Sequence, residues 1–177
     1  TTTATADGAV TIAPAAGFSV NDIAGNAATA AGGTDRSVTY DSTTPTLTLV
    51  QAAGQADPTN GATVQFTLTS NEALDGTTIA AADFTVTNGS AVTITGSGST
   101  WTLTTTATTN GAVTIAPSGT ISISDIAANA ATTAGGTDRS VTYDTTAPTF
   151  SLQQAAGQAD PARLSPVNFS LTEIGRA

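Results

Sequence analysis

Oxygen-bearing side chains recur at fixed spacings in this chain of 177 residues. Asp125 and Asn129 stand four residues apart, and Asp22 and Asn26 repeat that arrangement earlier in the chain. Carboxylates, amides and carbonyls are the ligands that a hard cation such as Ca²⁺ takes in proteins. We therefore predict a calcium site that draws on the following residues: Asp22, Asn26, Asp41, Glu72, Asp83, Asp125, Asn129 and Asp144.

Asp41 and Asp144 hold matching places, each at the end of the text "RSVTYD". An aspartate in such a place also forms turns, because its side chain bonds its own downstream backbone. Both interpretations stay open. Glu72, Asp75 or Asp83 would supply oxygen ligands from another part of the chain. No EF-hand pattern occurs, so the prediction rests on residue type and spacing.

The sequence offers little to catalysis. It has no His and no Cys, and its four positive residues are all Arg. These absences exclude Ser-His and Cys-His nucleophiles and Schiff-base chemistry on lysine. We predict that the chain is not an enzyme.

Charge and hydropathy exclude two classes of partner. The formal net charge is -9, whereas binding to nucleic acid needs clustered Lys and Arg. No apolar run approaches the length of a transmembrane helix, so we predict no membrane span in this segment.

The acidic residues sit in repeated text. Asp22–Asp41 and Asp125–Asp144 are identical at eighteen of twenty positions and lie 103 residues apart. "GAVTIAP" and "QAAGQADP" recur at the same offset, which indicates a tandem array. We predict the C-terminal part of one repeat at 1–44, a complete repeat at 45–147 and the N-terminal strands of a third at 148–177. Because the text begins inside a repeat, we expect a processed product, a fragment or part of a longer protein.

Alternation of apolar residues with Thr or Ser predicts short β-strands throughout. Thr46–Gln51 follows a proline and is typical of an edge strand. Ala62–Thr69 is the clearest strand, and Val64, Phe66 and Leu68 share one of its faces.

Turn signals place the remaining strands. "NGS" at Asn88 favours a tight hairpin into Ala91–Thr95, and Trp101 in Thr100–Thr105 is predicted to anchor the core. Seven or eight strands in the complete repeat point to an all-β sandwich. In the repeated loop Gly25 becomes Ala128, which predicts that this position does not need a positive φ.

The text "SVTYDTTAPT", "QAAGQADP", "VQFTLT" and D-x-A-x-N resembles the Ig-like tandem repeats of large secreted bacterial adhesins and surface proteins. The resemblance implies Greek-key Ig-like sandwiches that act as extenders, many of them rigidified by Ca²⁺ near their junctions. One departure is Asn71-Glu72-Ala73, which stands where the family has a Ser-Glu-Pro-like turn.

We therefore expect a non-catalytic structural module, a stiff spacer or stalk of an adhesin-like array, secreted or at the bacterial cell surface. Its partners would be neighbouring repeats in the same chain. One alternative is a self-assembling filament or surface-layer subunit, whose identical copies join head to tail by inter-chain strand complementation. A second is a glycan- or receptor-binding module, although regular threonine ladders are not evident in the text.

Overall fold

The computed structural model describes residues 1–28 and 33–175, so residues 29–32 of the first repeated text lie outside it. The described chain is all-β, as predicted, with one short 3₁₀ turn, η1 (Ala81–Asp83). The strands are β1 (Gly8–Thr11), β2 (Ser37–Tyr40), β3 (Thr46–Gln51), β4 (Thr63–Ser70), β5 (Phe84–Thr87), β6 (Thr93–Ser97), β7 (Thr100–Thr106), β8 (Gly111–Pro117), β9 (Thr132–Gly135), β10 (Ser140–Tyr143), β11 (Thr149–Gln154) and β12 (Phe169–Gly175).

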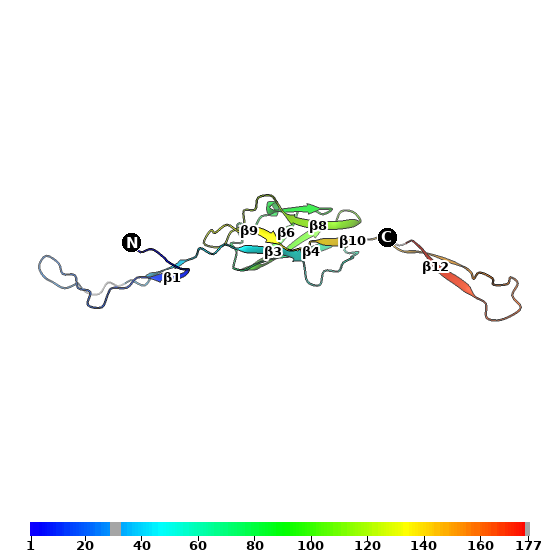
Figure 1. Ribbon diagram of the computed structural model, residues 1–177, viewed down its shortest axis with the longest axis horizontal. Helices are drawn as coiled ribbons and strands as arrows, with labels where there is room; N and C mark the ends of the chain where they lie inside the picture. The colour runs from blue at the N-terminus through cyan, green and yellow to red at the C-terminus, as the bar shows by residue number, and fades with distance from the viewer. Residues whose placement is uncertain (29–32, 176–177) are drawn as a thin grey trace.

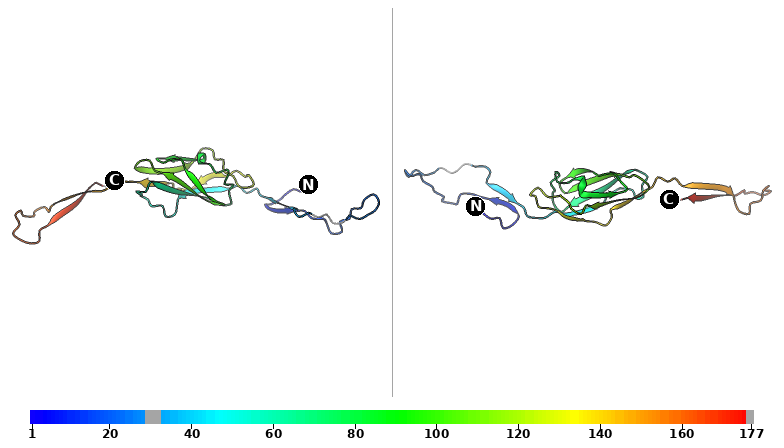
Figure 2. Two further views of the ribbon diagram at one scale, coloured as in Figure 1. Left: turned by 180° about the vertical axis from the view of Figure 1, so that it is seen from behind. Right: turned by 90° about the horizontal axis from the view of Figure 1, so that it is seen from above.

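Strands β3 to β10 form a central unit of two sheets, with the strand orders β6-β7-β4-β3-β9 and β10-β8-β5 (Figures 1 and 2). Both sheets contribute to one apolar core, which is the arrangement of a β-sandwich. Val64, Phe66 and Leu68 are fully buried on the face where period-two alternation predicted them. The residues that alternate with them, Thr63, Gln65, Thr67 and Thr69, are exposed or half-buried on the other face of the sheet.

The prediction of an edge strand at β3 is wrong. β9 pairs in parallel with β3 on the side away from β4, so the repeated Ala/Thr/Gly loop supplies the edge. The backbone N–H of Thr132 donates to the carbonyl of Pro45, which anchors this pairing at its start. Proline lacks an N–H, but its carbonyl still accepts a ladder bond.

The hairpin predicted at Asn88 is also wrong, because β5 and β6 belong to different sheets. Asn88 adopts a φ of 58° and turns the chain from one sheet to the other. Its side chain accepts hydrogen bonds from Thr108 and from Thr109, whose carbonyl oxygen accepts its amide N–H. Asn-Gly therefore makes a crossover here, because the tertiary contacts of Asn88 fix where the chain goes next.

Trp101 is only partly buried and packs at the margin of the core, where its indole N–H donates to the carbonyl of Gly98. Fully buried Phe66 is the largest core side chain. Threonine ladders, which the text did not make evident, are present on the outer face of the larger sheet. The pairs are Thr69 with Thr100, Thr67 with Thr102, Thr95 with Thr102 and Thr93 with Thr104.

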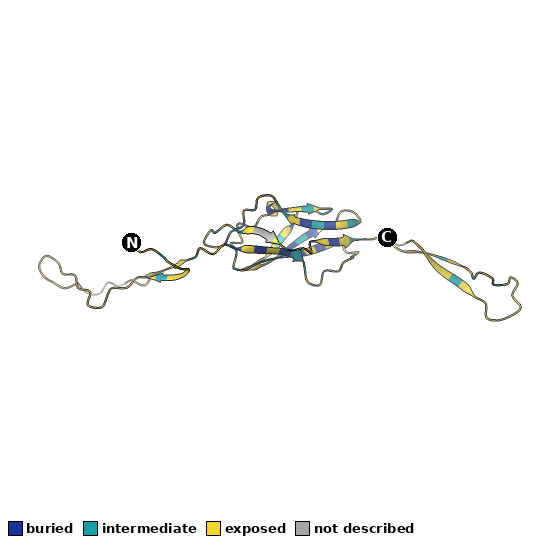
Figure 3. Cartoon of the chain, in the orientation of Figure 1, coloured by how far each residue is buried: buried dark blue, intermediate teal, exposed yellow. Residues whose placement is uncertain are grey.

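Two separate hairpins, β1–β2 and β11–β12, project from opposite ends of the central unit (Figure 1). Both are drawn mostly as exposed, in contrast to the buried strands between them (Figure 3). The helical content of the described residues includes nothing long and apolar enough to cross a membrane.

Candidate metal centre

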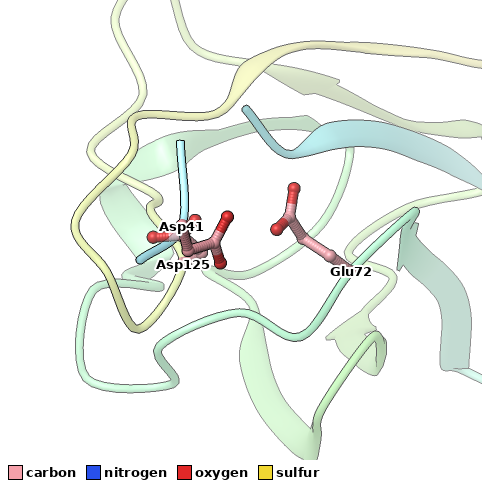
Figure 4. Close-up of side chains that lie close together, drawn as sticks. All are labelled: Asp41, Glu72 and Asp125. Carbon is pink, nitrogen blue, oxygen red and sulfur yellow. The ribbon is translucent and has the colours of Figure 1, made fainter. Parts of the chain in front are cut away.

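Three carboxylates from distant parts of the chain meet at one end of the central unit (Figure 4). Asp41 follows β2 in the link to the central unit, Glu72 follows β4, and Asp125 lies in the loop before β9. One oxygen from each lies within 4.8 Å of the others. Among residues 1–28 and 33–175 this is the one group of three or more carboxylate, His or Cys ligands. The sequence predicted all three members.

Asn129 shapes the loop that carries Asp125. Its backbone N–H and side-chain N–H donate to the two oxygens of Asp125, each at 2.8 Å. The same amide nitrogen lies 3.2 Å from the carbonyl oxygen of Asp41 and donates to it. Asn129 was predicted as a ligand, and these bonds give it the further task of holding the loop against the link. Asp125 is 2 % exposed.

The loop requires a left-handed residue even where glycine is absent. Gly25 has a φ of 88°, and Ala128 keeps a φ of 69° in the same place. The expectation that Ala128 would not need a positive φ is therefore wrong. The N–H of Ala128 bonds the carbonyl of Asp125 at 3.2 Å, so the turn geometry prevails over the preference of alanine for negative φ.

Ala128→Gly is expected to stabilise the central unit by about 1 kcal/mol, because glycine adopts this φ without a Cβ clash. Ala127→Gly is the matched control, and it should destabilise slightly through the added entropy of the unfolded chain. Urea denaturation followed by circular dichroism measures both. Equal effects of the two substitutions would contradict the strain at Ala128.

Glu72 carries the unusual electrostatics of the site. Its Oε1 is buried and has no hydrogen-bond partner among the described residues. Burial, followed by the charges of Asp41 and Asp125, raises the pKa of Glu72 above its usual 4.5. Burial alone would also raise the pKa of Asp125, but the bonds from Asn129 and from the N–H groups of Ala127 and Ala128 lower it below 3.8. The site therefore concentrates negative charge, and none of the contacts given above places a positively charged side chain beside it.

This donor set fits a hard divalent cation. Ca²⁺ binds oxygen ligands at about 2.3–2.6 Å, so two ligands on opposite sides of the ion lie roughly 5 Å apart. The separations of up to 4.8 Å between Asp41, Glu72 and Asp125 are compatible with that sphere. Carbonyl oxygens and water complete the coordination of such ions in proteins.

The turn-forming role of Asp41 is also present. Its Oδ1 accepts the N–H of Thr43 at 3.0 Å, which is the bond of an Asx turn. Asp144 does the same for Thr146 at 2.8 Å. A carboxylate has two oxygens, so Asp41 can accept the turn bond with one oxygen and bind a cation with the other.

Sequence reasoning missed Asp7, which clamps the same link. Its carboxylate accepts bonds from Ser42 and from the hydroxyl of Thr43. These bonds, from Thr43 first, lower the pKa of Asp7. Asn110 makes the equivalent contacts with Thr145 after β10. The sequence signal for this contact is the residue directly before each "GAVTI" text, which is Asp7 in one copy and Asn110 in the other.

Asp83, which was also predicted as a ligand, lies outside the three-carboxylate cluster. It is 3 % exposed inside the central unit. Its carboxylate accepts the N–H of Ala80 at 2.8 Å and both the N–H and the hydroxyl of Ser122, at 2.8 and 3.0 Å. Those donors occupy both oxygens and give Asp83 a structural role. Asp75 accepts its own turn bonds from Thr77.

The remaining predicted ligands lie away from the cluster. Asp22 and Asn26 repeat the internal bonds of Asp125 and Asn129, at 2.8 and 2.9 Å, but they are exposed near the β1–β2 hairpin. Asp144 lies after β10, where the side-chain N–H of Asn110 approaches it at 3.3 Å. Each is a partial copy of the arrangement that Asp41, Glu72 and Asp125 complete.

Comparison with protein-family models, with curated proteins and with solved structures finds no match to this chain. Its function is therefore argued from the repeats and from the site.

Proposed function

We propose that this chain is a spacer segment of a bacterial surface protein, built from Ig-like Greek-key repeats of about 103 residues joined into a stiff stalk. The role is structural and extracellular, as in the adhesin repeats that the text resembles. It requires no catalytic group, and none is assigned.

The observation that carries the proposal is the position of the acidic cluster. Asp41 belongs to the link that enters the central unit, whereas Glu72 and Asp125 belong to loops of that unit. An ion held by all three ties two successive repeats together. The bond from Asn129 to the carbonyl of Asp41 supports the same junction from the protein side.

Calcium binding supplies the stiffness in this proposal. Without a cation the three carboxylates repel one another, and this repulsion favours separation of the link from the central unit. A bound cation neutralises the carboxylates and removes the repulsion. Ca²⁺ would be held by Asp41, Glu72 and Asp125, with Asn129 orienting the loop. Asp7 adds to the negative potential, since its charge also raises the pKa of Glu72.

Calcium is expected to raise the melting temperature of the central unit. Saturation at a hundredfold excess over Kd stabilises by about 2.7 kcal/mol, which is on the order of 10 °C for a unit of this size. Differential scanning calorimetry in EDTA and in CaCl₂ measures the shift in melting temperature. Small-angle X-ray scattering measures the distribution of the chain's overall dimensions, which should be narrower in CaCl₂.

Asp125→Asn should remove the calcium shift. Asp22→Asn is its matched control, because Asp22 has the same local bonds with Asn26 but lies outside the three-carboxylate cluster. A melting temperature unchanged across a calcium titration would remove the metal from this proposal. Equal losses in the two variants would place the binding elsewhere.

A further inference from the structure

Asparagine followed by glycine occurs three times, as Asn60-Gly61, Asn88-Gly89 and Asn110-Gly111. All three pairs lie inside the complete repeat, 45–147. In this dipeptide the backbone nitrogen of glycine can attack the side-chain carbonyl carbon of asparagine, because glycine has no Cβ to hinder the approach. The two groups must reach each other, so the fold decides which of the three pairs reacts.

The fold holds Asn88 by its side-chain amide. The Oδ1 of Asn88 accepts the hydroxyl of Thr108, and also the N–H and the hydroxyl of Thr109, at 3.0, 3.1 and 2.7 Å. Its Nδ2 donates to the carbonyl of Thr109 at 2.8 Å. Gly89 is closely packed, since a Cβ added to it would lie 2.6 Å from Oγ1 of Thr105. Movement of the Asn88 side chain towards the nitrogen of Gly89 would break these hydrogen bonds.

Asn110 is held by the segment that follows β10. Its Oδ1 accepts the N–H and the hydroxyl of Thr145 at 3.1 and 2.8 Å, and its Nδ2 donates to the hydroxyl of Thr146 at 2.8 Å. Gly111 begins β8 and pairs with Tyr143 of β10. Both groups that would react are therefore fixed, the amide by hydrogen bonds and the glycine by the sheet.

Asn60 differs from both. Asn60 and Gly61 are exposed, and no hydrogen bond to the side chain of Asn60 is found within residues 1–28 and 33–175. The N–H of Gly61 donates to Oγ1 of Thr59 at 3.1 Å. Rotation of the Thr59 side chain releases this bond without any change in the two sheets. The side-chain amide and the glycine nitrogen are therefore both free to approach each other.

We propose that Asn60 is a site of spontaneous deamidation, and that the fold protects Asn88 and Asn110 from the same reaction. The nitrogen of Gly61 forms a bond to Cγ of Asn60. The bond from Cγ to Nδ2 breaks, and Nδ2 leaves as ammonia with the proton that the Gly61 nitrogen gives up. The product is a cyclic imide, and water opens it at either of its two carbonyl carbons. One opening gives aspartate and the other gives isoaspartate, so water is the one co-reactant.

The reaction changes both the charge and the backbone of this loop. It adds one negative charge to a chain whose formal net charge is already -9. Isoaspartate also lengthens the backbone by one carbon, between Thr59 and the start of β4 at Thr63. The N–H of Thr59 donates to the carbonyl of Thr142, and the carbonyl of Thr59 accepts the N–H of Asp144, each at 2.9 Å. The loop therefore lengthens between two points that pairing holds in place.

Incubation of the whole chain at mildly alkaline pH, in water enriched in heavy oxygen, tests the proposal. Base speeds the reaction because the attacking nitrogen must lose its proton. Digestion with pepsin at acid pH then stops it, and mass spectrometry reads each site. The peptide with Asn60 should become an acid that carries heavy oxygen. Asn88 and Asn110 should react at least about tenfold more slowly, because hydrogen bonds to their side chains must break first.

The same incubation in urea that unfolds the chain is the control for the fold, and there the three rates should converge. Gly61→Ala should slow the reaction at Asn60, because the new Cβ hinders the approach of the nitrogen. That Cβ would lie 3.5 Å from Oγ1 of Thr59, which is an ordinary contact, and circular dichroism should show an unchanged fold. Asn60→Gln should abolish the fast phase, since its longer side chain closes a larger ring more slowly.

Two results would overturn the inference. One is a folded chain in which the three sites react at equal rates, or in which Asn88 or Asn110 reacts first. The other is an Asn60 that stays unchanged in the folded chain while it reacts in urea.

Discussion

Asp83→Ala is expected to lower the unfolding free energy of the central unit by about 3 kcal/mol. The substitution removes an acceptor that serves Ala80 and Ser122 through three hydrogen bonds. Bonds to an ionised carboxylate are stronger than neutral ones, and the donors left behind have no replacement acceptor in the interior. Urea denaturation measures the loss.

The control for Asp83 is Asp138→Ala. Asp138 is exposed before β10, so its replacement should change stability by no more than about 0.5 kcal/mol. The calcium shift should survive in both variants, because neither residue belongs to the acidic cluster. Loss of that shift in Asp83→Ala, at temperatures where the unit is still folded, would contradict the structural role assigned to Asp83.

The strands that sequence predicted best are those with strict alternation. β3 runs over Thr46–Gln51 as predicted, and the buried face of β4 is the predicted one. Period-two burial is a local property, so the text alone determines it. Which strands pair is a tertiary property, and the Asn88 turn illustrates the limit: Asn-Gly specifies a change of direction, not the sheet that receives the next strand. β9 was missed because Ala, Thr and Gly give no apolar alternation.

The candidate site, too, could be predicted from the sequence only in part. The repeated text predicted that Asp41 and Asp125 lie near a junction, and Glu72 was one of three carboxylates expected from its other side; the structure brings Asp41, Glu72 and Asp125 together. Residue type could not separate Glu72 from Asp83, since both are carboxylates in irregular segments. The difference is the set of donors that folding places nearby: Asp83 meets three, whereas one oxygen of Glu72 meets none. An unsatisfied buried carboxylate oxygen is the signature that sequence cannot provide.

Glu72→Gln is expected to stabilise the chain in EDTA and to destabilise it in calcium. In EDTA the unchanged chain bears a penalty, because burial and the charges of Asp41 and Asp125 raise the pKa of Glu72. A raised carboxylate pKa means that the folded state holds the proton more tightly, so stability rises as pH falls through that pKa towards 4.5. Glutamine removes the penalty at neutral pH and flattens this rise. In calcium the same substitution removes a ligand and should forfeit much of the 2.7 kcal/mol or so of metal stabilisation.

The other perturbed carboxylates act in a separate pH window. The pKa values of Asp7, Asp22, Asp75 and Asp125 are lowered from 3.8, so the stability they contribute is lost only as pH falls below about that value. Calcium requires ionised ligands, so in CaCl₂ stability should instead fall as Glu72 protonates. Calorimetry from neutral pH to pH 4.5, with and without calcium, separates these cases. Glu173→Gln, on exposed β12, is the control and should show the pH dependence of the unchanged chain in both buffers. If the stability of the unchanged chain changes with pH in the same direction with and without calcium, the role given to Glu72 is refuted.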